Sequence, residues 1–145
     1  MTEQEYKKVE FYLYNYHKIN YLIKIRETDL IDSINVSNNA WIKSIKDTSN
    51  TMEEQAIKII DDNLIKEYQE WKKLIDNILQ ELRKYDKTKL KVVEYKFFGN
   101  IPEDVIADEL FVSKTTVRTY INDIYFEVGI LATFNNLITK SMFSS

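Results

Sequence analysis

Cysteine is absent from this chain of 145 residues, which also has only one proline, two glycines and one histidine. Without cysteine there are no disulfides, thiolate nucleophiles or thiolate zinc sites, and His17 alone cannot build a histidine metal cluster. The scarcity of glycine and proline leaves few positions where helices must stop. We therefore expect an all-α protein that holds no metal and needs no cofactor.

Long hydrophobic runs are also lacking. No apolar run approaches the roughly 18 to 20 residues that span a bilayer, and the first ten residues lack the apolar centre of a signal peptide. With 44% hydrophobic residues, the chain has the size of one compact domain or of two small helical modules. These features predict a cytoplasmic protein without a membrane partner.

The net charge of −3 is unfavourable for a protein that binds nucleic acid nonspecifically. The charge is uneven, however. Residues 83–96 contain six basic residues and only two acidic ones, Asp86 and Glu94. A solvated helix surface and a basic face for a polyanion explain this stretch equally well. The basic residues are Arg83, Lys84, Lys87, Lys89, Lys91 and Lys96.

Two heptad-like series predict two long helices in residues 1–84, which together would form a helical hairpin. The first helix is expected over about residues 3–31, with Asn20 as a polar residue in its apolar series. The second is expected over about residues 52–84, with Thr51 and Glu54 as a capping box at its start. The intervening segment 32–50 is rich in Ser and Asn and predicts a loop, with one helical turn around Trp41.

The C-terminal part, residues 85–145, predicts a second module. A helix ends at Gly99-Asn100, and another begins after Pro102 with acidic residues in its first turn. The segment FVS then forms a turn, and Ser113 is suited to cap the next helix, which Gly129 is expected to end. After Gly129, a short amphipathic helix can follow.

The apolar residues around this turn have the spacing of a helix-turn-helix motif, whose second helix lies in the major groove of DNA. A small residue, Ala107, stands where two steeply crossing helices touch. Phe111 departs from the pattern, because that turn position usually holds glycine. The expected core of the motif is Ile106, Ala107, Leu110, Val112 and Val117.

Polar residues remain on the open side of the second helix, and their types suit DNA. Arg donates two hydrogen bonds to guanine, Asn pairs with adenine, and Thr contacts phosphate or a thymine methyl group. An ordinary polar helix face is the competing interpretation, and the full pattern favours DNA. The candidate DNA-binding residues are Ser113, Lys114, Thr115, Arg118, Thr119 and Asn122.

The segment from Val92 to Gly129 resembles the helix-turn-helix of sigma factor region 4. The segments VEFYLYNYHKINYLIKI and SNTMEEQAIKIIDD resemble the N-terminal half of the RinA/ArpU group of phage late-gene regulators. This resemblance implies a phage or prophage activator in a bacterial host cell. Such a protein binds double-stranded DNA upstream of packaging, structural or lysis genes and acts with RNA polymerase. It also implies that Lys89, Lys91 and Lys96 contact phosphates.

Other functions remain open. A homodimer through the N-terminal helices would add DNA contacts to an acidic chain. A small-terminase-like packaging subunit would instead form a closed ring. A third alternative is a protein-binding adaptor with a degenerate helix-turn-helix. Its best support is the excess of acidic residues after residue 90, where seven acidic residues accompany five basic ones. An enzyme is not expected, because no phosphate loop, metal-ligand spacing or nucleophile-base arrangement is present.

Overall fold

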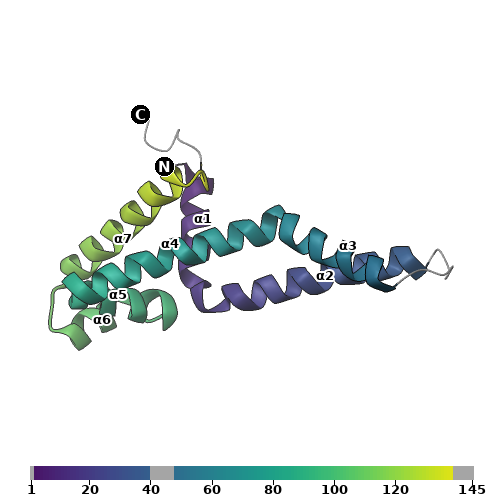
Figure 1. The fold of residues 1–145 in the computed structure, drawn as a ribbon. Coiled ribbons are helices and arrows are strands. Elements are labelled where there is room, and N and C mark those ends of the chain that lie inside the picture. The colour runs from purple at the N-terminus through teal and green to yellow at the C-terminus, as the bar shows by residue number, and fades with distance from the viewer. Residues whose placement is uncertain (1, 40–47, 139–145) are drawn as a thin grey trace. The chain divides into compact units, whose positions relative to one another are not determined.

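The structure is a computed structural model that describes residues 2–39 and 48–138. Over these residues it contains α-helices and no strand, which confirms the all-α fold class (Figure 1). A short 3-10 helix, η1 (Tyr16–Lys18), follows α1, and a π-helical segment, η2 (Glu94–Phe98), follows α5. The α-helices are α1 (Glu3–Tyr14), α2 (Ile19–Asn39), α3 (Thr48–Asp61), α4 (Asn63–Tyr85), α5 (Lys87–Val93), α6 (Glu103–Leu110) and α7 (Lys114–Phe134).

The chain divides into two compact units, and the division differs from the border expected at residue 84. One unit combines Met1–His17 with Glu70–Ser145, and the other is Lys18–Gln69. The first unit therefore joins α1 and most of α4 to the C-terminal helices. The reason is packing, because Tyr12 of α1 stacks on the fully buried Trp71 of α4 with ring centroids 4.4 Å apart.

Aromatic contacts continue through the core of this first unit. The ring of Phe97 meets Tyr14 of α1 and Tyr125 of α7 edge-on, with centroids 5.0 and 5.6 Å apart. These contacts tie α1, η2 and α7 together. The aromatic residues Tyr12 and Tyr14 of α1 thus take part in the packing of this unit, whereas Phe11 remains 44% exposed.

A polar contact holds η1 to α4 within the same unit. The Tyr16 hydroxyl donates to the carboxylate of Asp76, which also accepts from the Lys72 ammonium at 3.1 Å. Burial first, and then the bond to Asp76, raise the pKa of Tyr16 to about 12. Tyr16 is therefore a neutral donor at any ordinary pH.

The prediction of one helix over residues 3–31 is wrong, because α1 ends at Tyr14 and α2 begins at Ile19. The side-chain amide of Asn15 donates to the carbonyl of Phe11 at 2.8 Å. Such a local bond competes with the regular helix pattern and favours a helix end. The break also changes the register of the apolar series, and Asn20 lies exposed.

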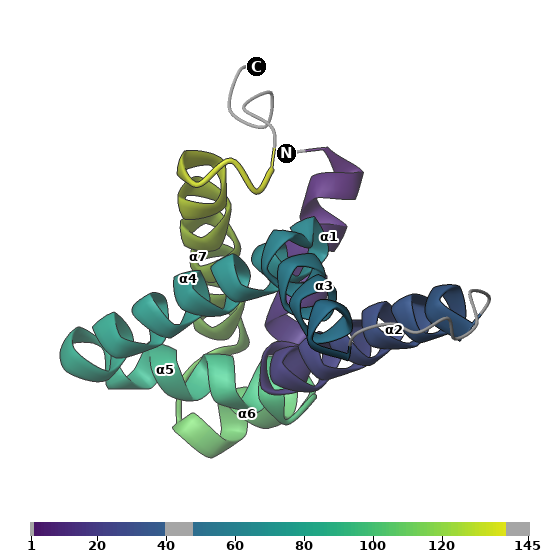
Figure 2. The same cartoon turned by 45° about the vertical axis from the view of Figure 1, so that its right-hand side comes forward.

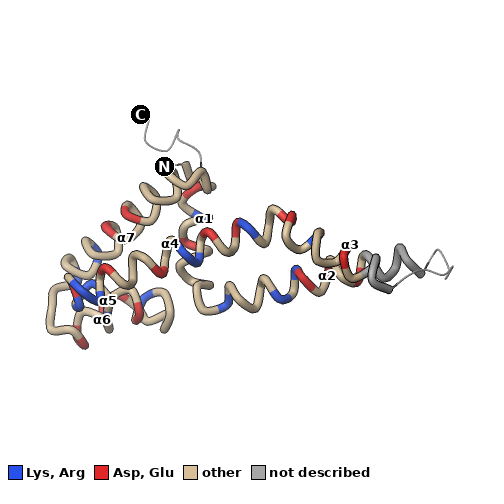
Figure 3. Tube along the Cα trace, in the orientation of Figure 1, with Lys and Arg blue, Asp and Glu red and all other residues tan. Residues whose placement is uncertain are grey.

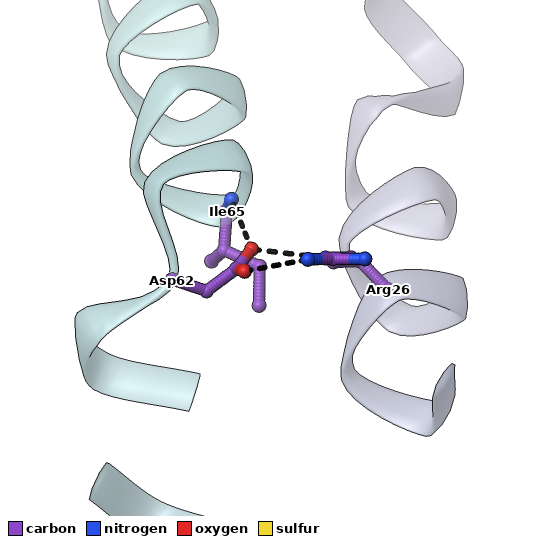
Figure 4. Close-up of polar contacts among 3 residues, drawn as sticks. All are labelled: Arg26, Asp62 and Ile65. Carbon is purple, nitrogen blue, oxygen red and sulfur yellow. Dashed lines mark hydrogen bonds and ion pairs between the residues drawn. The ribbon is translucent and has the colours of Figure 1, made fainter. Parts of the chain in front are cut away.

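The helix expected over residues 52–84 is likewise interrupted, here at Asp62. Asp62 caps α4, since its carboxylate accepts from the backbone N–H of Ile65 at 3.0 Å. The same carboxylate accepts from Nε and Nη2 of Arg26 at 3.1 and 2.8 Å (Figure 4). The pKa of Asp62 falls below its ordinary value chiefly because of Arg26. The predicted helix start at Thr51 is wrong too, because α3 begins at Thr48.

In the second unit, α2 and α3 lie side by side as a helical hairpin (Figures 1 and 2). Few of the described side chains in this unit are buried, and large apolar ones remain exposed. Ile57, Ile60 and Leu64 follow each other at helical spacing and are 58, 68 and 36% exposed. The loop expected over residues 32–50 is shorter than predicted, because α2 extends to Asn39; Trp41 lies outside the described residues.

The expectation that Gly129 ends the last helix is wrong. Gly129 is buried inside α7, which continues to Phe134, so the short helix expected after it is the end of α7. Asn135 caps α7, and Asn136 follows with a positive φ of 59°, so that Leu137 N–H donates to the carbonyl of Ala132 at 2.8 Å. Asn is a common residue in this conformation.

Candidate nucleic-acid interface

A three-residue turn joins α6 to α7, and an unusual backbone conformation shapes it. Phe111 ends α6 in the left-handed region, with φ 57° and ψ 41°. Two backbone bonds close the turn, from Val112 N–H to the carbonyl of Ala107 at 3.1 Å and from Phe111 N–H to that of Asp108 at 3.4 Å. This is the pattern in which helices commonly end on glycine. The Phe111 side chain points away from the core and is 94% exposed.

Three of the five apolar residues predicted around this turn are buried, and α6 packs against α7. Ile106 and Val117 are fully buried, and Ala107 is 5% exposed. Leu110 and Val112 are only half-buried. The buried series of α7 continues beyond Val117 through Ile121, Ile124, Tyr125 and Val128.

The opposite face of α7 carries the predicted DNA-binding residues, and all of them are exposed. Lys114, Thr115, Arg118, Thr119 and Asn122 lie at positions i, i+1, i+4, i+5 and i+8, which fall on one side of a helix. The structure thus brings the predicted residues together on the surface. Ser113 differs from them, because its hydroxyl caps α7 by accepting from Thr116 N–H at 3.0 Å.

Arg118 is paired within the chain. Its Nε donates to Oε1 of Glu103 at 2.6 Å, and its Nη2 donates to Oε2 at 3.2 Å. The Arg118 side chain is 59% exposed, whereas that of Glu103, in the first turn of α6, is 20% exposed. The pKa of Arg118 is raised chiefly by this bond. Glu103 could not be identified from the sequence, because partners 15 residues apart on two helices leave no periodic signal.

Lys89, within the basic stretch, is also paired within the chain. Its ammonium lies 3.2 Å from Glu127 and 3.6 Å from Asp123, both on α7, and its side chain is 12% exposed. Burial opposes the charge, but these carboxylates outweigh it and raise the pKa of Lys89. Lys91 is exposed and Lys96 half-buried, and Figure 3 shows basic residues at the end of α4 and along α5.

The residues that the structure describes contain no group of three or more His, Asp or Glu placed to hold a metal ion. None of the described helices is both long and apolar enough to cross a membrane. The candidate interface is therefore a polar helix face with one internal ion pair, and the exposed Lys91 lies on α5, which packs against α7.

Comparisons with protein-family models, with curated proteins and with solved structures returned no match. The resemblance to RinA/ArpU regulators and to sigma factor region 4 accordingly stays a prediction from the sequence.

Proposed function

We propose that the chain is a sequence-specific DNA-binding protein and that α6 and α7 act as its helix-turn-helix motif. The observation that carries this proposal is the division of α7 into two faces. One face is buried, and α7 packs against α1, α5 and α6. The other presents five exposed polar side chains, starting at the first residue after the turn. A helix of this kind fits the major groove with its N-terminal residues against base edges.

The chemistry of the exposed face supports base reading. Arg118 suits guanine, Asn122 suits adenine, and the methyl groups of Thr115 and Thr119 suit thymine. Lys114, at the first position of α7, would reach the edge of the groove on this proposal. The capped N-terminus of α7 adds a partial positive charge that favours phosphate.

Phosphate contacts would position this helix on the duplex. We assign them to Lys91 and Lys96 and no longer to Lys89, because Glu127 and Asp123 already neutralise the Lys89 ammonium. Only Lys91 and Lys96 are then assigned to phosphates, and the chain as a whole has a net charge of −3. Each phosphate contact contributes to affinity, so a single copy is expected to bind weakly.

A second copy of the chain would supply the missing contacts. The exposed apolar residues Ile57, Ile60 and Leu64 form a stripe along α3 and the start of α4, and they support self-association through the hairpin. Two copies joined in this way would bind two half-sites. On the resemblance to RinA/ArpU regulators, the protein would be a regulator of phage late, packaging or lysis genes that acts with RNA polymerase.

Binding-site selection from a random pool of DNA duplexes at moderate salt tests this proposal. The wild-type chain should enrich one motif. The double variant Lys114→Ala/Arg118→Ala should lose that enrichment while keeping its helical content, because both residues are exposed. If the wild-type chain enriches no sequence, α7 is not an independent reader of DNA and the proposal fails.

A further inference from the structure

The pairing of Arg118 with Glu103 leaves one edge of the guanidinium open. A guanidinium carries five N–H donors in one plane, and these form two forks with fixed directions. Glu103 occupies the fork made by Nε and Nη2. Within the described part of the chain Nη1 has no hydrogen-bond partner, and the side chain is more than half exposed. The terminal fork, made by Nη1 and the second proton of Nη2, is therefore available.

The terminal fork has the geometry that guanine requires. Two parallel N–H donors match the O6 and N7 acceptors in the major groove, and an arginine can therefore hold a carboxylate on one fork and a guanine on the other. A free arginine side chain loses considerable rotamer freedom when it binds. Glu103 has already restricted Arg118, because it lies in the first turn of α6 and only 20% of its side chain is exposed.

We propose that Glu103 is a positioning residue that fixes the Arg118 guanidinium so that its terminal fork reads one guanine. This inference rests on the proposed DNA-binding function. It assigns a specificity role to an acidic residue beside the DNA. A carboxylate near phosphates weakens attraction to every sequence alike, so Glu103 lowers overall affinity while it raises selectivity.

The substitution Glu103→Gln separates these two effects, because it removes the charge and keeps the shape. Affinity for unrelated duplexes should rise, since one negative charge is lost. Discrimination at one G·C pair of the selected site should fall by about ten-fold, within the range attributed to a bidentate arginine–guanine contact. Asp104→Asn is the matched control, because Asp104 is the neighbouring exposed carboxylate and does not contribute to the pKa shift of Arg118.

The experiment uses the full chain and the duplex that the wild type enriches. Fluorescence anisotropy gives dissociation constants for this duplex and for a panel in which each G·C pair is replaced in turn by A·T. The result expected is that Asp104→Asn tightens binding to all duplexes alike, whereas Glu103→Gln binds one replaced duplex almost as well as the original. If Glu103→Gln discriminates between the original and every replaced duplex as strongly as the wild type does, the positioning role is wrong. The DNA-binding proposal would not be affected by that result. Failure of the wild type to enrich any duplex would overturn both.

A second measurement covers the case in which Glu103→Gln does not fold. The Nε–H resonance of wild-type Arg118 reports the bond to Glu103 directly. If Glu103 positions Arg118 on DNA, this resonance keeps its shift and slow exchange when the selected duplex is added. If the pair breaks on binding, the resonance moves and exchanges faster, and the positioning role is wrong.

Discussion

Asp62 binds Arg26 across the helical hairpin and caps α4 with the same carboxylate. The two hydrogen bonds to Arg26 measure 3.1 and 2.8 Å, and the bond from Ile65 N–H measures 3.0 Å (Figure 4). The Asp62 side chain is 10% exposed and that of Arg26 is 36% exposed. One carboxylate thus links the break between α3 and α4 to the middle of α2.

This link predicts a pH dependence of hairpin stability. The folded-state pKa of Asp62 lies below its ordinary value of 3.8, so ionised Asp62 stabilises the fold above that pH. The contribution is lost as the pH falls through the folded-state pKa. Asp62→Asn keeps the cap and removes the charge. Amide exchange in α2 and α3 should therefore be faster in this variant than in the wild type at pH 7. In acid, the exchange rates of the variant and the wild type should become equal. Asp62→Ala should cost about 1 kcal/mol more, because it also removes the cap. Equal amide exchange rates in Asp62→Asn and the wild type at pH 7 would show that the Asp62 charge does not stabilise the hairpin.

The left-handed conformation of Phe111 predicts a stabilising substitution. Phe111→Gly should raise the free energy of unfolding by about 0.5 to 1 kcal/mol, because glycine adopts positive φ without steric cost and the exposed ring buries little area. Phe111→Ala is the control, since it removes the ring and keeps the strain. Chemical denaturation should place Phe111→Ala near the wild type. A glycine variant no more stable than the alanine variant would show that the turn is not strained.

Lys89 and Lys91 are predicted to differ in function although they lie two residues apart. Lys89→Gln should lower the free energy of unfolding by up to about 1 kcal/mol, because it removes the ion pairs with Glu127 and Asp123, whose side chains are 43 and 50% exposed. The pKa of Lys89 is raised, so its contribution is present below its ordinary value of 10.5 and disappears as the pH rises through the folded-state pKa.

Lys91→Gln should instead leave stability unchanged and weaken DNA binding. The slope of log affinity against log salt should fall by about 0.9, which corresponds to one phosphate contact. Thermal denaturation and salt-dependent anisotropy on the same two variants check both expectations. The assignment fails if Lys89→Gln changes the salt slope and Lys91→Gln does not.

The exposed stripe on the hairpin predicts self-association. Ile60→Glu should shift the chain toward monomer in light scattering with little change in stability, because Ile60 is 68% exposed. Phe134→Glu is the control, since Phe134 is 79% exposed at the end of α7 and lies outside the stripe. A wild type that is already monomeric would contradict the hairpin interface. A closed ring of many subunits would favour the packaging alternative.

The sequence allowed the helical class, the α6–α7 turn and the exposed face of α7 to be predicted, because these depend on local patterns. Ser113 caps the helix that follows it, and the small Ala107 is buried, as its position within the apolar spacing indicated. The breaks at Asn15 and Asp62 were missed. Heptad spacing continues across them in the sequence, while side-chain bonds at these two residues interrupt the helices.

The electrostatic partners could not be predicted from the sequence. Arg118 pairs with Glu103 15 residues away, and Lys89 pairs with Glu127 38 residues away. Such pairs form only when separate helices pack, so the charge pattern along the chain does not reveal them. They change the candidate site nonetheless, because they remove Lys89 from the phosphate contacts and restrict the orientation of Arg118.

The most direct test of the central claim is a map of amide shift changes in the full chain on addition of DNA duplex. If α7 reads DNA, the amides of Lys114, Thr115, Arg118, Thr119 and Asn122 should shift together, with smaller changes at Lys91 and Lys96. Shifts confined to other helices, with those of α7 unchanged, would contradict the claim that α7 reads DNA.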